Sequence, residues 1–288
     1  MGRARQAETY SDMQYRVVVC VALAWCASLP AAAQNQQPKF QTGWPCSGKV
    51  DPSYVRTAEA TGGKVMLFTS NEITGAADDM SASSRHRETV FRAGGQLDDG
   101  VHDFDIPLDS TIESAYFFMA LQCQQFVAVL QPAGDELRAD APGVDSHAFE
   151  AVRLVTITAP SPGTWKVRMA GRGFFSVIVT AKTTLALTRV SLAQNGAPIK
   201  GLAPLGKAVR LEAATSGEPS QVGFHFVSMR GATLRTVDLR LEQDAAASRT
   251  YAGEVTLPET EFRLLLTGFD AKGFPFQRVT PQLFIADR

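Results

Sequence analysis

Apolar and polar residues alternate with a period of two along most of the chain, from about residue 87 to the carboxyl end. The clearest example is at 261–288, where two alternating apolar runs flank the turn 270–273, which ends in a glycine. Such alternation predicts strands with one buried face, and the glycine supplies the positive φ that a hairpin turn requires. The predicted strands fall into two sets, the first at 87–93, 100–107, 112–121, 124–131, 149–158, 164–169 and 173–182, the second at 185–192, 207–213, 221–228, 233–241, 250–257, 261–269 and 275–285.

Clusters of turn-forming residues such as 93–95, 132–135 and 160–163 separate these strands. Seven short strands at this spacing are typical of a sandwich or jelly roll, so the fold class is predicted to be mainly β, with two consecutive antiparallel β-sandwiches at 87–183 and 184–288. The inward face of the second sandwich is expected to comprise Leu211, Val222, Phe224, Phe226, Val237, Leu239, Val255, Leu264 and Leu266.

A short α/β segment precedes the sandwiches. Asp51 and Pro52 are typical of the cap and first position of a helix, and Gly62-Gly63 is a helix stop. The segment 64–68 (KVMLF) predicts a buried strand, and 70–80 a second helix. The stretch 34–45 is polar and contains proline, which predicts a flexible arm before the helix.

The amino-terminal segment 1–33 is predicted to be a signal peptide. Its apolar run 17–26 is too short to span a bilayer, and Pro30-Ala31-Ala32-Ala33 has an Ala-x-Ala cleavage pattern. The alternative is a membrane anchor, which the length of the run disfavours. We therefore expect a secreted or periplasmic protein, without stable membrane insertion after cleavage.

Composition narrows the classes of partner. The chain of 288 residues has a formal net charge of −1 and no dense run of lysine and arginine, so a nucleic-acid partner has no electrostatic support. Cleavage at Ala33 would leave two cysteines, Cys46 and Cys123, for which a disulfide is the simplest expectation in an oxidising compartment.

Three segments, taken in order, carry a resemblance to a known family: 109–114 (DSTIES), 162–167 (PGTWKV) and 268–279 (GFDAKGFPFQRV). Together they resemble the region that follows the von Willebrand factor A domain in hemicentins and their relatives, and 58–65 is similar to the end of that A domain. The resemblance implies a galactose-binding-like jelly roll followed by an immunoglobulin-like sandwich, with 34–86 as an arm and a truncated A-domain end that should dock on the jelly roll. An A domain binds its cation through a loop after its first strand and through ligands from later loops; most of that domain is missing from the chain, so metal-dependent adhesion is not carried over.

Two groups of residues are candidates for a binding site. Asp98, Asp99, Asp103 and Asp105 offer hard oxygen ligands of the kind that calcium takes, although carboxylates in a loop and on an outward strand face need no metal. Trp165 is a candidate for stacking on a sugar ring, but its alternation with Val167 also fits a core position.

No catalytic pattern interrupts the strands. The chain has four histidines and no Gly-x-Ser-x-Gly elbow, and its glycine doublets lack the phosphate-loop spacing. We therefore predict a non-enzymatic protein without a required cofactor, which binds a protein or a cell-surface component through an exposed sandwich face. Gln125, Arg153 and Arg278 are polar positions that could lie on such a face. The alternative is a lectin-like carbohydrate-binding module, with or without calcium.

Overall fold

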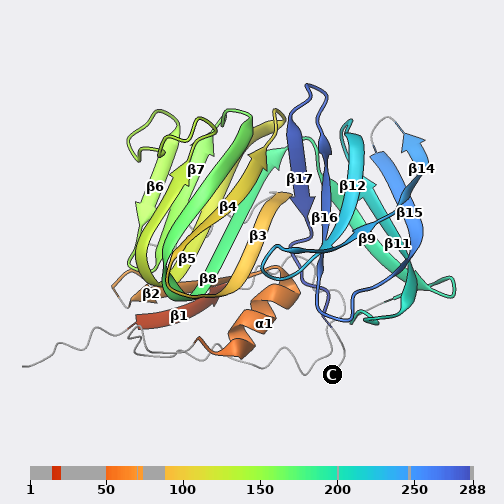
Figure 1. Ribbon diagram of the computed structural model, residues 1–288, viewed down its shortest axis with the longest axis horizontal. Helices are drawn as coiled ribbons and strands as arrows, with labels where there is room; N and C mark the ends of the chain where they lie inside the picture. The colour runs from red at the N-terminus through yellow and green to blue at the C-terminus, as the bar shows by residue number, and fades with distance from the viewer. Residues whose placement is uncertain are drawn as a thin grey trace, which may run out of the picture.

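A computed structural model describes residues 15–20, 50–69, 71–73, 88–199, 201–245 and 248–285. Two antiparallel β-sandwiches lie side by side, and α1 and β2 lie across one end of the assembly (Figure 1). The fold is therefore mainly β, as the alternation predicts.

Helix α1 (Pro52–Thr61) has the ends that the sequence predicts. The side chain of Asp51 accepts a hydrogen bond from the Ser53 amide at 2.8 Å, and Gly62 ends the helix in the left-handed conformation, with φ of 74°. Strand β2 (Lys64–Thr69) follows directly and pairs with β1 (Tyr15–Cys20). Of the predicted second helix, 70–80, residues 70 and 74–80 lie outside the described residues.

The first sandwich is one sheet of six strands that folds back on itself. Its order is β3-β8-β5-β7-β6, and β4 pairs with the first half of β8. The bounds of its strands are β3 (Glu88–Leu97), β4 (Val101–Leu108), β5 (Ile112–Leu130), β6 (Val144–Ala148), β7 (Val152–Thr158) and β8 (Gly163–Thr183).

Strands β5 and β8 are each continuous where the sequence predicts two shorter strands. The register between them shifts near Cys123 and again near Phe126, and Gly171 faces this point on β8. A Cβ on Gly171 would lie 2.2 Å from the Cys123 carbonyl oxygen, and its φ of 142° disfavours other residues. The strands therefore bend here without ending, because bulges and glycine let both cross from one layer to the other.

Each face of this sheet has its own apolar core. The inner core lies between the two layers and includes Phe117, Trp165 and Phe175. The outer core joins the other face of the sheet to α1 and β2, through residues such as Phe68 and Phe118. The α/β segment thus docks on the first sandwich, as expected.

The second sandwich has immunoglobulin-like topology. One sheet has the order β10-β9-β11-β15-β14 and the other β13-β12-β16-β17, which reproduces the ABED and CFG arrangement with an added strand on each sheet. All nine residues predicted for the inward face belong to its core or pack against it. Its strands are β9 (Leu187–Gln194), β10 (Ala197–Pro198), β11 (Ala208–Thr215), β12 (Ser220–Val227), β13 (Thr233–Val237), β14 (Arg240–Ala245), β15 (Ser248–Thr256), β16 (Arg263–Phe269) and β17 (Pro275–Val279).

The predicted carboxyl-terminal hairpin is the pair β16–β17. Asp270 closes its turn by accepting backbone hydrogen bonds from Lys272 and Phe274 at 2.9 Å, and Gly273 has the positive φ. Strand β17 lies against β3 and β4, so this hairpin joins the two sandwiches. No described helix has both the length and the apolar character needed to cross a membrane.

Candidate functional site

The aspartate cluster of β4 forms cross-strand ion pairs. Asp103 accepts two hydrogen bonds from the Arg168 guanidinium, both at 2.8 Å, and Lys166 lies 3.2 Å from Asp103 and 3.4 Å from Asp105. Hydrogen bonding from Arg168 lowers the pKa of Asp103 to about 2. The other two members, Asp98 and Asp99, are exposed.

These pairings remove the geometric support for the calcium hypothesis. Arginine and lysine occupy oxygens of Asp103 and Asp105 that a cation would need. Across the described ranges, no group of three or more histidine, cysteine or acidic residues is arranged to hold a metal ion.

Trp165 is a core residue in the structure. Its side chain is buried at 2% exposure, its ring lies 6.3 Å from that of Phe117, and its indole N–H donates to the Ser161 carbonyl at 2.9 Å. A ring whose face is covered by protein cannot stack on a sugar. The assignment of Trp165 as a ligand-binding residue is therefore wrong.

The predicted disulfide is not visible in the described part of the chain. Cys123 is buried at the bend of β5, with 8% exposure. Its proposed partner, Cys46, lies outside the described residues, so the pairing stays a prediction.

The three polar positions suggested for a binding face differ in their exposure to solvent. Gln125 is exposed, whereas Arg153 is half-buried and donates to the Val127 carbonyl at 2.6 Å. Arg278 is completely buried. Its placement on an open face is wrong, because a polar residue on a strand at a junction between domains can face the neighbouring domain instead of water.

The described histidines have local partners. The two ring nitrogens of His225 lie 3.2 Å from the hydroxyls of Thr236 and Thr267, and burial lowers the pKa of this histidine. The ring of His102 contacts the Asp98 carbonyl at 3.1 Å. Neither of these two arrangements includes the carboxylate that orients the base in a catalytic triad. The third described histidine, His147, has its Nε2 atom 3.2 Å from Asp145 Oδ1, and both side chains of this pair are exposed.

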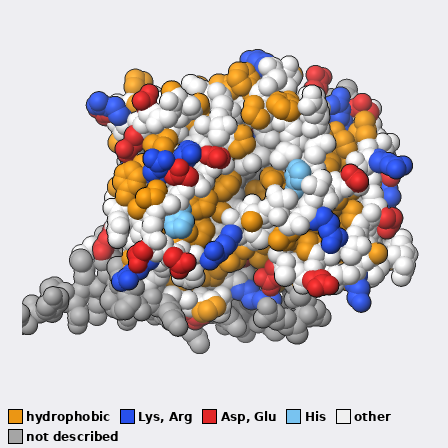
Figure 2. Space-filling model, viewed as in Figure 1, with side chains coloured by type: hydrophobic (Ala, Val, Ile, Leu, Met, Phe, Trp, Pro, Cys, Tyr) orange, Lys and Arg blue, Asp and Glu red, His pale blue; other side chains and the backbone are white. Residues whose placement is uncertain are grey.

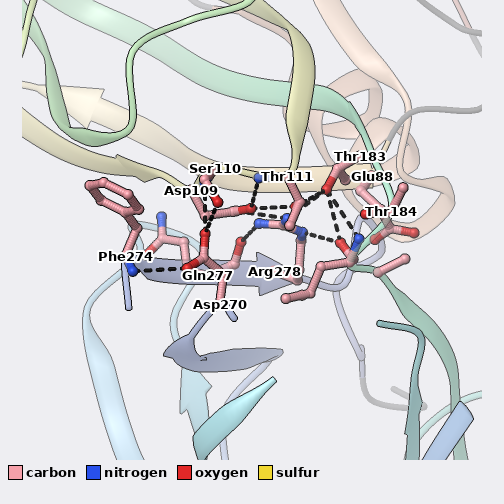
Figure 3. A network of polar contacts seen from close by, with 12 residues as sticks. Glu88, Asp109, Ser110, Thr111, Thr183, Thr184, Asp270, Phe274, Gln277 and Arg278 are labelled. Carbon is pink, nitrogen blue, oxygen red and sulfur yellow. Dashed lines mark hydrogen bonds and ion pairs between the residues drawn. The ribbon is translucent and has the colours of Figure 1, made fainter. Parts of the chain in front are cut away.

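Arg278 lies at the centre of the contact between the two sandwiches (Figure 3). Its Nη2 atom is 2.8 Å from Asp109 Oδ2, and its Nε donates to the Leu185 carbonyl at 2.7 Å. Both charged side chains of this pair have 0% exposure. The hydroxyl of Thr183 lies 3.0 Å from the guanidinium and extends the network to the end of β8.

A second contact lies beside this pair. Asp270, which closes the β16–β17 turn, accepts hydrogen bonds from the amide and hydroxyl of Ser110 at 2.8 and 2.6 Å. Two consecutive residues of the β4–β5 loop, Asp109 and Ser110, are therefore both bound by the β16–β17 hairpin. The segments 109–114 and 268–279, which carry the resemblance noted above, meet in space.

The α/β segment joins the same assembly through Glu59 on α1. One carboxylate oxygen lies 3.1 Å from Nη2 of Arg92 on β3, and the other contacts Nη2 of Arg263 on β16. The Arg92 guanidinium also donates to the carbonyls of Gly62 and Gly63 at 3.1 and 2.6 Å. A cation from the first sandwich thus caps the carboxyl end of α1, where the helix dipole favours positive charge.

These three side chains are almost completely buried: exposure is 8% for Glu59, 2% for Arg92 and 0% for Arg263. Burial lowers the pKa of Arg92 to about 10 and that of Arg263 to about 9, so both remain protonated at neutral pH. The Nε atoms of both arginines are buried without a hydrogen-bond acceptor among the described residues. The cluster therefore holds more positive charge than Glu59 neutralises.

A cavity of about 400 Å³ opens next to this cluster, where α1, the first sandwich and the second sandwich meet. Glu59 lines it together with the ion pair between Arg56 and Glu261, whose charged atoms are 3.2 Å apart. Arg230 lies at the same cavity, and its guanidinium donates to the Gln96 carbonyl at 2.8 Å. The remaining lining is largely apolar and comprises Val50, Pro52, Val55, Gly95, Phe174, Met229, Leu283 and Ile285. We call this cavity the junction pocket.

Four guanidinium groups lie in or directly behind the junction pocket, against two carboxylates. Arg230 has no carboxylate partner among the residues that the structure describes. On the face drawn in Figure 2, lysine, arginine and acidic side chains are interspersed, with hydrophobic side chains reaching the surface between them. The junction pocket is therefore a local site of positive charge on a protein whose net charge is close to zero.

Comparison with known families and with curated proteins finds no match to this chain. Among solved structures, the chain is similar to the Bacillus licheniformis lipase BlEst2 in its propeptide form, with 13% sequence identity and a TM-score of 0.32. The similarity covers 70% of this chain and 42% of the lipase chain, so the chain spans less than half of that protein. A similarity at this level carries no inference about activity.

Sequence reasoning did not identify the junction pocket. Local pattern places Glu59 in a helix and Arg92 and Arg263 in strands, but it does not bring them together, because Glu59 and Arg263 lie 263 − 59 = 204 positions apart. One signal was present in the sequence: Arg92 and Arg263 fall within strands of alternating apolar residues. A charged side chain that is buried in such a strand needs a partner of opposite charge, so a nearby buried carboxylate is expected.

Proposed function

We propose that the protein is an exported, non-enzymatic binding module that recognises an acidic side chain of a protein partner in the junction pocket. The observation that supports this proposal is the excess of guanidinium groups over carboxylates in and behind the pocket. An anionic group from a partner would balance that charge. The apolar lining offers a surface for the rest of the bound segment.

Arg230 is the residue most suited to contact such a ligand. It is exposed, lines the pocket and has a guanidinium whose fork geometry matches a carboxylate. Glu59 and Glu261 are already engaged by other arginines, so they leave Arg230 available. The buried ion pairs that connect the three parts would keep the pocket in one shape before the ligand arrives, which lowers the entropic cost of binding.

The test is a peptide array probed with the mature chain, residues 34–288, in which each glutamate- or aspartate-containing peptide is matched by its amide version. We expect acidic peptides to bind and their amide versions to bind at least about tenfold more weakly, since a charge-assisted hydrogen bond contributes roughly 1.5–3 kcal/mol. A higher salt concentration should weaken the binding of the acidic peptides.

Arg230→Glu should abolish this preference. Arg240→Glu is the matched control, because Arg240 is an exposed arginine on β14, remote from the pocket lining, and the charge change is identical. Equal binding of acidic and amide peptides, or an equal effect of the two substitutions, would rule out the junction pocket as an acidic-ligand site.

A further inference from the structure

Strand β2 has the composition of a central strand but has one strand partner among the described residues. Val65, Met66, Leu67 and Phe68 are all buried, and all four belong to the outer core of the first sandwich. Because successive side chains point to opposite faces, consecutive burial means that both faces of β2 are covered. Its lateral edge is paired by β1, from Tyr15 opposite Thr69 to Cys20 opposite Lys64.

That partner lies inside the predicted signal peptide. If export removes residues 1–33, β2 loses every strand hydrogen bond that β1 provides along this edge. Backbone groups left unpaired at a covered site lose their hydration without gaining a partner, and an open apolar edge is a template for another strand.

The chain that would remain next to β2 is poorly suited to replace β1. The arm 34–49 has prolines at positions 38 and 45 and glycines at positions 43 and 48. The longest stretch of the arm without proline or glycine is therefore four residues. Proline cannot donate to a strand ladder. A second copy of the mature chain would also lack residues 15–20.

We propose that the mature protein binds, along the edge of β2, an extended apolar segment of a partner protein that runs antiparallel and takes the place of β1. The segment has the chemistry of YRVVVC: about six residues, rich in β-branched side chains and without proline. This inference rests on the proposed export. It concerns a surface distinct from the junction pocket, whose lining contains no residue of β2.

The experiment uses the mature chain, residues 34–288, and a fluorescein-labelled hexapeptide with the sequence of residues 15–20, with serine replacing the cysteine. We expect saturable binding in fluorescence anisotropy. Amide hydrogen exchange should slow at alternate residues of Lys64–Thr69 when the peptide is present, because the amides that face the added strand acquire acceptors.

Two control peptides separate strand addition from simple apolar adhesion. Each carries N-methyl groups on one of the two alternating sets of amides. In an antiparallel pair only one set faces β2, so one peptide should bind at least about tenfold more weakly and the other should retain its affinity. Equal affinity of both peptides, or unchanged exchange at β2, would overturn the proposal.

Two further outcomes would also count against it. Slow exchange at β2 in the mature chain without peptide would show that the chain itself closes this edge, and an exported protein that still begins before Tyr15 would show that β1 stays in place. Arg230→Glu should leave hexapeptide binding unchanged, so failure at the pocket and failure at the β2 edge can be told apart.

Discussion

Replacing Glu59 with glutamine removes the one carboxylate that two buried guanidinium groups share. Arg92 and Arg263 would keep their charge at neutral pH, because their pKa values of about 10 and 9 lie above it. Breaking a buried pair by removing one partner costs about 3–5 kcal/mol, since an uncompensated charge is left in a region of low dielectric. With two arginines stranded instead of one, we expect the upper part of this range.

Arg263→Met provides the comparison that tests the reasoning. It removes one of the two cations and leaves the pair between Glu59 and Arg92 intact, with an apolar side chain of similar length at the vacated position. The remaining cluster is neutral. We therefore expect Arg263→Met to cost at most about 1 kcal/mol, far less than Glu59→Gln, although both variants delete one member of the same cluster.

The assay is urea unfolding of the mature chain at pH 7, followed by circular dichroism and by the fluorescence of Trp165. Trp44→Phe in all variants makes the fluorescence specific to the first sandwich. A loss of 4 kcal/mol should also lower the melting temperature by roughly 8–16 °C. If Glu59→Gln costs less than about 1 kcal/mol, or if Arg263→Met is equally damaging, the cluster is not a buried carboxylate shared by two cations.

Three further predictions concern the two sandwiches. Asp109→Asn should cost about 3–5 kcal/mol and separate calorimetric unfolding into two steps, because it leaves Arg278 buried without its carboxylate, whereas Glu113→Gln in the exposed pair with Lys182 should change stability by less than about 0.5 kcal/mol. Since the pKa of Asp103 is lowered in the folded state, the contribution of Asp103 to the free energy of unfolding is present at neutral pH and is lost as the pH falls from about 4 toward 2. Urea titrations should show that Asp103→Asn removes this loss of stability at low pH. At pH 7 the substitution should cost less than about 1 kcal/mol, because the side chain is partly exposed. Gly171→Ala should destabilise the first sandwich by more than about 3 kcal/mol in urea unfolding, because its Cβ would meet the Cys123 carbonyl, whereas Gly134→Ala, also at positive φ but with open space around it, should cost only about 1 kcal/mol.

The sequence predicted the features that depend on local pattern. Alternation located most strands, the Asp51-Pro52 start and the Gly62 stop located α1, and the turn at Asp270 located the β16–β17 hairpin. The two long strands were divided incorrectly, since glycines and polar residues that usually mark a turn can also mark a bend within a strand. Strand β6 was missed because its short sequence, VDSHA, is polar and exposed on an edge.

The junction pocket could not be predicted from such patterns. Whether a carboxylate is solvated or buried depends on elements that are distant in sequence, and Glu59 meets Arg92 and Arg263 only after three parts of the chain assemble. The same limitation misplaced Arg278, while the aspartates of β4 turned out to be paired by Lys166 and Arg168 on the neighbouring strand. Local sequence identifies which groups carry charge, and tertiary pairing decides which of them remain open to a ligand.

The positions of the buried ion pairs bear on why the three parts form one body. Apolar surfaces can slide past one another, whereas a buried ion pair restricts the distance and angle between the elements that contribute to it. Glu59 restrains α1 relative to β3 and β16, and the pair of Asp109 with Arg278 restrains the β4–β5 loop relative to β17. These two restraints act at different places between the same two sandwiches. Together they oppose a rotation of one sandwich relative to the other, which a single contact would allow. The elements that line the junction pocket are then fixed by charges buried behind it.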